Sequence, residues 1–133
     1  MSNTIINKIL NEAIEKSLGL GGIVIDGTPR SYNQIIDIDE LLSLYNKKID
    51  LAIFIDTTIE ECKKRISLRT SIEKRVDDTP PAIEQRLKIY FEETVPIINE
   101  FEKRGILLKI NGNPSEEIVW NELRQKVKEY FLL

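Results

Sequence analysis

The sequence contains no histidine and only one cysteine, Cys62, among its 133 residues. Without histidine, the chain cannot use a Ser-His or Cys-His nucleophile, a histidine general base or a histidine metal ligand. A single cysteine excludes an intrachain disulfide and a cysteine-based zinc cluster. Any catalysis must therefore rest on arginine, lysine, aspartate, glutamate and backbone groups.

Long apolar runs and an excess of positive charge are missing too. No signal peptide and no run long enough to span a membrane is visible, so we expect a cytoplasmic protein with no membrane partner. The formal net charge of −3 argues against a general nucleic-acid binder, but one nucleotide needs only a local basic cluster. The length suits a single domain, residues 1–133, with one core.

The segment Gly22–Gln34 is the most informative part of the chain. Its apolar residues 23–25 lie between glycines and predict a buried strand that ends at a sharp turn. Asp26 and Arg30 follow this strand. In open α/β sheets, ligands bind at the carboxyl ends of the strands, which is where these two residues would lie. Arg30 offers a planar fork suited to phosphate or carboxylate. The alternative is a surface corner at which Asp26 and Arg30 simply pair.

The remaining pattern predicts an α/β protein in which strands alternate with helices. A capping box opens the helix that carries Arg65 and Arg69, and Asn113 is expected to cap the last helix, with Pro114 as its first residue. We expect strands at 22–26, 51–56 and 106–110, helices at 1–18, 31–44, from 57 onward, 80–104 and 113–130, and an exposed loop at 70–81.

Five of the seven arginines fall at positions with a coherent chemical interpretation. Phosphoryl transfer needs positioning and neutralisation of the charge that develops on phosphate oxygens, which a ring of guanidinium groups supplies. The alternative is an ordinary solvated basic surface. The five are Arg30 after the first strand, Arg65 and Arg69 on one helix face, Arg75 in the loop and Arg86 on the following helix.

These spacings resemble the short-lid form of the adenylate kinase and nucleoside monophosphate kinase family. The family's Asp-Gly-Phe-Pro-Arg-x-x-x-Gln segment is similar to residues 26–34, with Thr28 in place of Phe. The spacing Arg65-x-x-x-Arg69-x-x-x-x-x-Arg75-Val76-Asp77-Asp78, with Arg86 eleven residues beyond Arg75, is similar to the family's lid region. Residues 90–96 resemble its Tyr-x-x-x-Thr-x-Pro helix.

The resemblance implies a three-layer parallel sheet with flanking helices, of the P-loop NTP hydrolase-like nucleotide kinase type, with a short lid loop at about 70–81. It also implies reversible transfer of the terminal phosphoryl group of ATP, with Mg²⁺, to AMP or another nucleoside monophosphate. Asp26 would orient the Mg²⁺ through water. No covalent enzyme intermediate is expected.

Residue roles follow from the same resemblance. Binding of ATP would involve Arg65 against the adenine, Arg69 at the phosphates, and Pro114 in the loop 111–114. The catalytic arginines would be Arg69, Arg75 and Arg86, of which the last two would bridge the phosphates of both nucleotides. The nucleoside monophosphate would contact Gly27, Thr28, Pro29, Arg30, Gln34, Arg75 and Arg86.

One family feature is missing, because no G-x-x-x-x-G-K-[ST] phosphate loop occurs in the sequence. The chain resembles the carboxyl-terminal two-thirds of the family, without its first strand. We therefore expect a gap between the strands at 22–26 and 51–56. Such a gap would leave backbone groups unpaired, or force them to pair elsewhere or with another chain.

Three interpretations remain open. In the first, the chain is part of a kinase that was truncated, encoded by a split gene or given a misplaced start codon, and the phosphate loop is encoded just upstream or supplied by a partner chain. Alternatively it is a non-catalytic nucleotide-binding or assembly module derived from the kinase fold. In the third interpretation it is a structural α/β domain with incidental arginines. Without a partner chain we expect a monomer.

Overall fold

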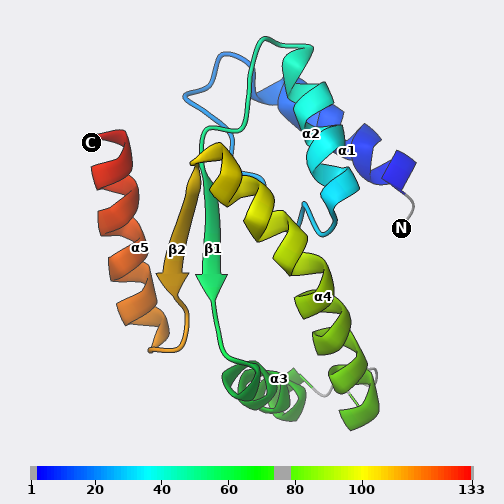
Figure 1. Ribbon diagram of the computed structural model, residues 1–133, viewed down its shortest axis with the longest axis vertical. Coiled ribbons are helices and arrows are strands. Elements are labelled where there is room, and N and C mark those ends of the chain that lie inside the picture. The colour runs from blue at the N-terminus through cyan, green and yellow to red at the C-terminus, as the bar shows by residue number, and fades with distance from the viewer. Residues whose placement is uncertain (1–2, 74–78, 133) are drawn as a thin grey trace.

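The computed structural model describes residues 3–73 and 79–132 and has an α/β fold (Figure 1). Helices α1 and α2 pack together at one end of the molecule, and α3 lies beyond the carboxyl ends of the strands. The elements in chain order are α1 (Asn3–Ser17), α2 (Tyr32–Ser43), β1 (Ala52–Asp56), α3 (Ile59–Glu73), α4 (Pro80–Arg104), β2 (Leu107–Asn111) and α5 (Glu116–Phe131).

Strands β1 and β2 form a parallel pair in the described chain, with Ala52 opposite Leu107 and Asp56 opposite Asn111. The pairing begins where the Ala52 N–H donates to Ile106 O at 2.9 Å, and Gly112 N–H continues it by donating to Asp56 O at 2.7 Å. Parallel neighbours need a long crossover connection. Helices α3 and α4 provide that crossover. The two strands run in the same direction, and the carboxyl ends of both point toward α3 (Figure 1).

The strand expected at 22–26 is not present, and that prediction is wrong. Residues 22–26 have no regular secondary structure. The side chains of Ile23 and Ile25 pack on the core between α1 and α2, while Val24 is 93% exposed. A strand is stable only when a neighbour satisfies its backbone groups. In the described residues, β1 pairs with β2 alone, so residues 22–26 have no strand beside them.

The edge of β1 that faces away from β2 carries backbone groups without a strand neighbour in the described chain. In a parallel ladder, alternate residues direct both backbone polar groups to the same side. Ala52 and Asp56 bond toward β2, so the N–H and C=O of Ile53 and Ile55 point to the open edge. The side chains of Ile53 and Ile55 are each 44% exposed. This edge of β1 is therefore both apolar and open.

Buried residues form one cluster between α1 and α2, and further buried side chains lie around the sheet. The first cluster consists of Leu10, Ile14, Ile38 and Leu42. Phe101 of α4 and Ile110 of β2 are buried near the sheet, and Ile83 is buried in the first turn of α4. Burying an aliphatic side chain of this size contributes about 1.5–3 kcal/mol. These contacts fix α4 against β2, whose carboxyl end borders the candidate site.

Local sequence signals set several helix ends as predicted. Helix α4 begins at Pro80 and ends at Arg104, and Gly105 adopts a left-handed conformation with φ 73° just after it. Helix α3 continues to Glu73 and α4 begins at Pro80, so the loop expected at 70–81 is wrong at 70–73 and 80–81, which are helical, and its positions 74–78 lie outside the described residues. No glycine or proline interrupts this stretch before Pro80.

The capping residue expected for α5 is wrong. Ser115, not Asn113, caps this helix, with its Oγ accepting a 3.5 Å hydrogen bond from Ile118 N–H. The side chain of Asn113 is instead bonded to Thr58, which removes it from capping. In the part of the chain that the structure describes, no helix is long and apolar enough to cross a membrane.

Candidate nucleotide-binding site

The turn before α2 brings five of the predicted site residues together, Gly27, Thr28, Pro29, Arg30 and Gln34. Gln34 Oε1 accepts hydrogen bonds from the backbone N–H of Arg30 and from Thr28 Oγ1, the latter at 3.3 Å. Ser31 caps α2 and accepts the Gln34 N–H at 3.4 Å. The turn is shaped by Gly27, with φ 90°, and by a cis peptide bond before Pro29. Residues 27–34 therefore form one hydrogen-bonded unit.

The guanidinium of Arg30 is oriented by this turn. Its Nε donates to Gly27 O at 2.9 Å, and the residue as a whole is exposed. Holding Nε in this way fixes the plane of the guanidinium, whose Nη groups have the fork geometry that matches phosphate oxygens. Asp26, which was expected to pair with Arg30 if the turn were only a surface corner, shares no ion pair with it among the described residues.

A second cluster connects α3 to the loop before α5. Arg65 Nη2 donates to the carbonyl oxygens of Asn113 and Pro114, both at 3.0 Å, and its Nε donates to Glu61 at 2.9 Å. The fold therefore places Arg65 beside Pro114, two residues that the family resemblance assigned to the same nucleotide. Arg65 remains exposed, so one face of its guanidinium is accessible to a ligand.

Asn113 and Thr58 belong to this cluster although the sequence did not indicate them as site residues. Asn113 Oδ1 accepts from Thr58 N–H at 3.0 Å and from Thr58 Oγ1 at 3.4 Å, and Asn113 N–H donates to Asn111 Oδ1 at 3.1 Å. Thr58 Oγ1 also accepts from Glu61 N–H at 3.3 Å, as a capping residue. The only sequence signal was the Asn-Gly-Asn-Pro turn.

The other predicted arginines lie on α3 and α4 or outside the described residues. Arg69 is half-buried one turn beyond Arg65, and Arg86 is exposed on α4. The two helices are joined by an ion pair between Lys63 and Glu84. Arg75 lies outside the described residues, as do the other positions of the expected lid loop from 74 to 78.

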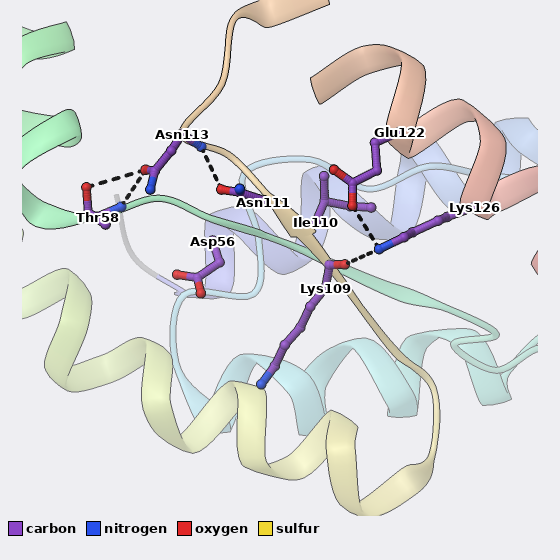
Figure 2. A pocket seen from close by; sticks show the side chains of 8 residues that line it. All are labelled: Asp56, Thr58, Lys109, Ile110, Asn111, Asn113, Glu122 and Lys126. Carbon is purple, nitrogen blue, oxygen red and sulfur yellow. Dashed lines mark hydrogen bonds and ion pairs between the residues drawn. The ribbon is translucent and has the colours of Figure 1, made fainter. Parts of the chain in front are cut away.

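A polar pocket of about 300 Å³ lies at the carboxyl ends of β1 and β2 (Figure 2). Lys109 points toward α4, while Glu122 and Lys126 extend from α5 on the other side of β2. Lys126 Nζ bonds to Glu122 at 2.8 Å and to Lys109 O at 3.4 Å. The residues that line it are Asp56, Thr58, Lys109, Ile110, Asn111, Asn113, Glu122 and Lys126.

This pocket shares none of the predicted site residues. Two carboxylates and two ammonium groups balance its charge, so it lacks the positive excess that binds phosphate. Asn113 nevertheless borders both the pocket and the Arg65 cluster. The pocket therefore lies at the carboxyl end of the sheet, the end at which open α/β proteins bind ligands.

Asp26 fits a magnesium ion only when the phosphates of a bound nucleotide supply further ligands. Its carboxylate is a hard oxygen donor, the type that Mg²⁺ prefers. It is exposed, and the described residues contain no cluster of three or more metal-ligating side chains. Mg²⁺ is commonly held by one or two carboxylates together with substrate phosphates and water, and Asp26 suits that arrangement.

Comparison with known proteins shows the family. The family model described as adenylate kinase matches residues 1–106. The chain is 32% identical over 110 residues to an adenylate kinase of Bifidobacterium longum, covering 83% of this chain and 59% of that protein. It is 30% identical over 129 residues to one of Hyphomonas neptunium, covering 97% and 68%. It is 33% identical over 115 residues to one of Thermobifida fusca, covering 86% and 61%.

The fold is that of an α/β protein, and the Arg65 cluster lies at the carboxyl end of its parallel strands. The chain belongs to the adenylate kinase family. It spans about 60% of the length of the relatives from Bifidobacterium and Thermobifida that it matches.

Proposed function

We propose that this chain forms the nucleotide-binding part of a nucleoside monophosphate kinase that transfers the terminal phosphoryl group of ATP reversibly to AMP or another nucleoside monophosphate. The observation that carries the proposal is the contact of Arg65 with the loop at Asn113 and Pro114. Family membership supports it, because the relatives are named adenylate kinases. We further propose that the chain acts in the cytoplasm.

Each cluster has a proposed role in this reaction. The turn at 27–34 binds the acceptor nucleotide, with Arg30 at its phosphate and Gln34 at its base. Arg65 and the carbonyl of Pro114 border the adenine of ATP. The Nε anchor at Gly27 O reduces the entropy that Arg30 loses on binding a phosphate, since its guanidinium is already oriented.

The remaining arginines are proposed to stabilise the transferred group. Arg69, Arg75 and Arg86 would neutralise charge on the phosphate oxygens as the phosphoryl group moves between nucleotides. Closure of the lid region around Arg75 would exclude water and so limit ATP hydrolysis. Mg²⁺ supplies charge neutralisation at the phosphates when it is bound, and Asp26 would hold its water ligands.

A strand followed by a phosphate loop is proposed to complete the site. The open edge of β1 offers the backbone groups of Ile53 and Ile55, flanked by their exposed side chains. A parallel apolar strand from another polypeptide, or from another segment of a longer one, would satisfy those groups. Its G-x-x-x-x-G-K-[ST] loop would provide the N–H cradle for the phosphates of ATP.

The test measures ADP formation from ATP, Mg²⁺ and AMP by the folded chain, alone and with an added segment that carries a strand and a phosphate loop. We expect turnover only with the segment, and loss of most of it in Arg75→Ala. Arg124→Ala serves as the matched control, because Arg124 is an exposed arginine of α5 outside both clusters. Equal turnover in the two variants would contradict the phosphate role of Arg75.

The alternative is a non-catalytic nucleotide-binding or assembly module derived from the kinase fold. The open edge of β1 favours it, because a chain that assembles through strand addition needs such an edge. Binding of ATP and AMP, with no ADP formed even after the segment is added, would support this alternative. Absence of nucleotide binding by the folded chain, both alone and with the segment, would exclude the kinase and nucleotide-binding functions and leave only an assembly role.

A further inference from the structure

The side-chain amide of Gln34 is held by two donors from its own chain. Its Oε1 accepts from Arg30 N–H and from Thr28 Oγ1. An amide oxygen has two lone pairs for accepting hydrogen bonds, and these two bonds occupy both. The Arg30 bond comes from the backbone and persists with any side chain at position 28. The second bond exists only because residue 28 has a hydroxyl group.

The Nε2 group of Gln34 is the part of the amide that remains for a ligand. Within the described residues, Oε1 is the only atom of this side-chain amide that bonds to another residue. The Gln34 backbone N–H is fixed by Ser31, so the residue is anchored at both its backbone and its amide oxygen. The side-chain amide of Gln34 therefore has donors that no described residue uses and no vacant acceptor.

We propose that Thr28 is a specificity-determining residue that weakens selection for a 6-amino purine. The inference rests on the proposed function, in which Gln34 contacts the acceptor base. Adenine places an amino donor beside a ring-nitrogen acceptor, so an amide with a vacant oxygen lone pair can bind both groups. With its oxygen saturated, Gln34 can only donate, and either base offers one acceptor for that bond, the ring nitrogen of adenine or the carbonyl oxygen of a 6-keto purine. Because Arg30 N–H holds Oε1 in place, a lone pair freed there would accept from a 6-amino group but would repel the oxygen of a 6-keto group.

The test compares the dissociation constants of AMP and IMP for the full chain by isothermal titration calorimetry. These two ligands differ at the 6-position and in the protonation of the neighbouring ring nitrogen. Thr28→Val keeps the side-chain shape but removes the hydroxyl, which returns one lone pair to Gln34 Oε1. We expect it to raise the preference for AMP over IMP by about 2- to 10-fold, the effect of one neutral hydrogen bond.

Three further variants keep the experiment decisive. Thr28→Ser retains the hydroxyl and should keep the wild-type AMP-to-IMP ratio. Thr28→Ala, which also lacks the hydroxyl, should move the ratio in the same direction as Thr28→Val, and it replaces that variant if circular dichroism shows misfolding. Arg30→Ala keeps the backbone N–H, so it should weaken both ligands equally.

The outcomes separate this inference from the function on which it rests. An unchanged ratio in Thr28→Val and Thr28→Ala, with both ligands still bound, overturns the role of Thr28 and leaves the acceptor site standing. A shift toward IMP also overturns it. If the folded wild-type chain binds neither AMP nor IMP, the proposed acceptor site fails and the inference fails with it.

Discussion

Arg65 Nη2 donates a 3.0 Å hydrogen bond to the carbonyl oxygen of Pro114, a residue 49 positions further along the chain. The same nitrogen donates to Asn113 O, and Arg65 Nε is bonded to Glu61 within α3. One guanidinium thus connects a helix to the loop that leads into α5. Five donor hydrogens in a rigid fork make arginine suited to such a junction.

Replacing Arg65 should affect ATP more than it affects folding. We expect Arg65→Ala to weaken ATP binding about tenfold, as the loss of a charged hydrogen-bonding group does. The free energy of unfolding should fall by about 1 kcal/mol or less, because the side chain is 45% exposed and its ion pair is screened. Calorimetric titration with ATP and urea unfolding measure the two effects.

Two controls accompany this variant. Arg65→Lys keeps the positive charge but lacks the fork, so it should recover only part of the ATP affinity. Arg124→Ala removes an exposed arginine elsewhere and should leave ATP affinity unchanged. If Arg65→Ala binds ATP as the wild type does, Arg65 is a structural connection only.

Gly112 is required by close packing at the end of the β1–β2 pair. A Cβ atom at this buried position would lie 2.2 Å from Thr57 Oγ1 and 2.7 Å from Ile55 Cγ2. Gly112→Ala should therefore lower the free energy of unfolding by about 1–3 kcal/mol, a typical cost of overpacking. The midpoint of urea unfolding reports this change when the slope is unaltered.

Gly21→Ala is the matched control for that substitution. A Cβ atom at Gly21 would have no neighbour within 4 Å, and no positive φ constrains the backbone there. The unfolding midpoint should stay within experimental error or rise slightly, because alanine restricts the unfolded chain. A midpoint shift as large as that of Gly112→Ala would show that crowding at Gly112 is not the cause.

Arg104 connects the end of α4 to α2 through a two-point ion pair. Its Nη1 and Nη2 donate to the two carboxylate oxygens of Asp39 at 3.0 and 2.7 Å, and Nε donates to Glu100 at 3.0 Å. The hydrogen bond to Asp39 raises the pKa of Arg104 above its usual range. The guanidinium therefore stays charged at neutral pH, and its own deprotonation would weaken the pair only in strong alkali.

We expect Asp39→Asn to destabilise the protein by about 0.5–1 kcal/mol, near the upper end for a partly exposed pair with ideal geometry. The loss should shrink as salt is added, since screening weakens the wild-type pair. The Lys63–Glu84 pair is more exposed, with side chains 43% and 66% accessible, so Glu84→Gln should change the unfolding free energy little. Equal effects of the two substitutions at low salt would contradict this ranking.

The thiol of Cys62 should react slowly at neutral pH. Burial raises its pKa, the Arg65 guanidinium opposes that change, and the Glu61 carboxylate adds to it. Only the thiolate is nucleophilic, so the rate of alkylation by iodoacetamide should rise at higher pH than for an unperturbed thiol. The chain unfolded in urea is the control, and its alkylation rate should rise with pH as it does for an unperturbed thiol.

Arg65→Ala extends this test, because removing the opposing positive charge should raise the pKa of Cys62 further. Its alkylation at pH 8 should then be slower than in the wild type. Faster alkylation would indicate that the substitution exposes Cys62 to solvent. A measurement of thiol accessibility in the folded variant can verify that exposure.

Local sequence signals were sufficient for the existence and order of the helices and for several of their ends. The bounds of α4 follow from Pro80 at its start and Gly105 after its end, both of which act within one turn of helix. The first turn of α3 follows from Thr58, whose hydroxyl accepts the Glu61 N–H. These features depend on neighbours in the sequence, so a sequence pattern can predict them.

Tertiary structure decided where strands form and which side chains serve the site. Residues 22–26 have the composition of a strand, but a strand needs a partner, and β1 pairs only with β2 in the described chain. Asn113 is placed to cap a helix, but its side chain instead accepts a hydrogen bond from Thr58, 55 residues away. The sequence by itself determined the presence of the helices, the β1–β2 strands and the family. Strand pairing and long-range hydrogen bonds depend on segments distant in sequence, so only the folded chain could decide them.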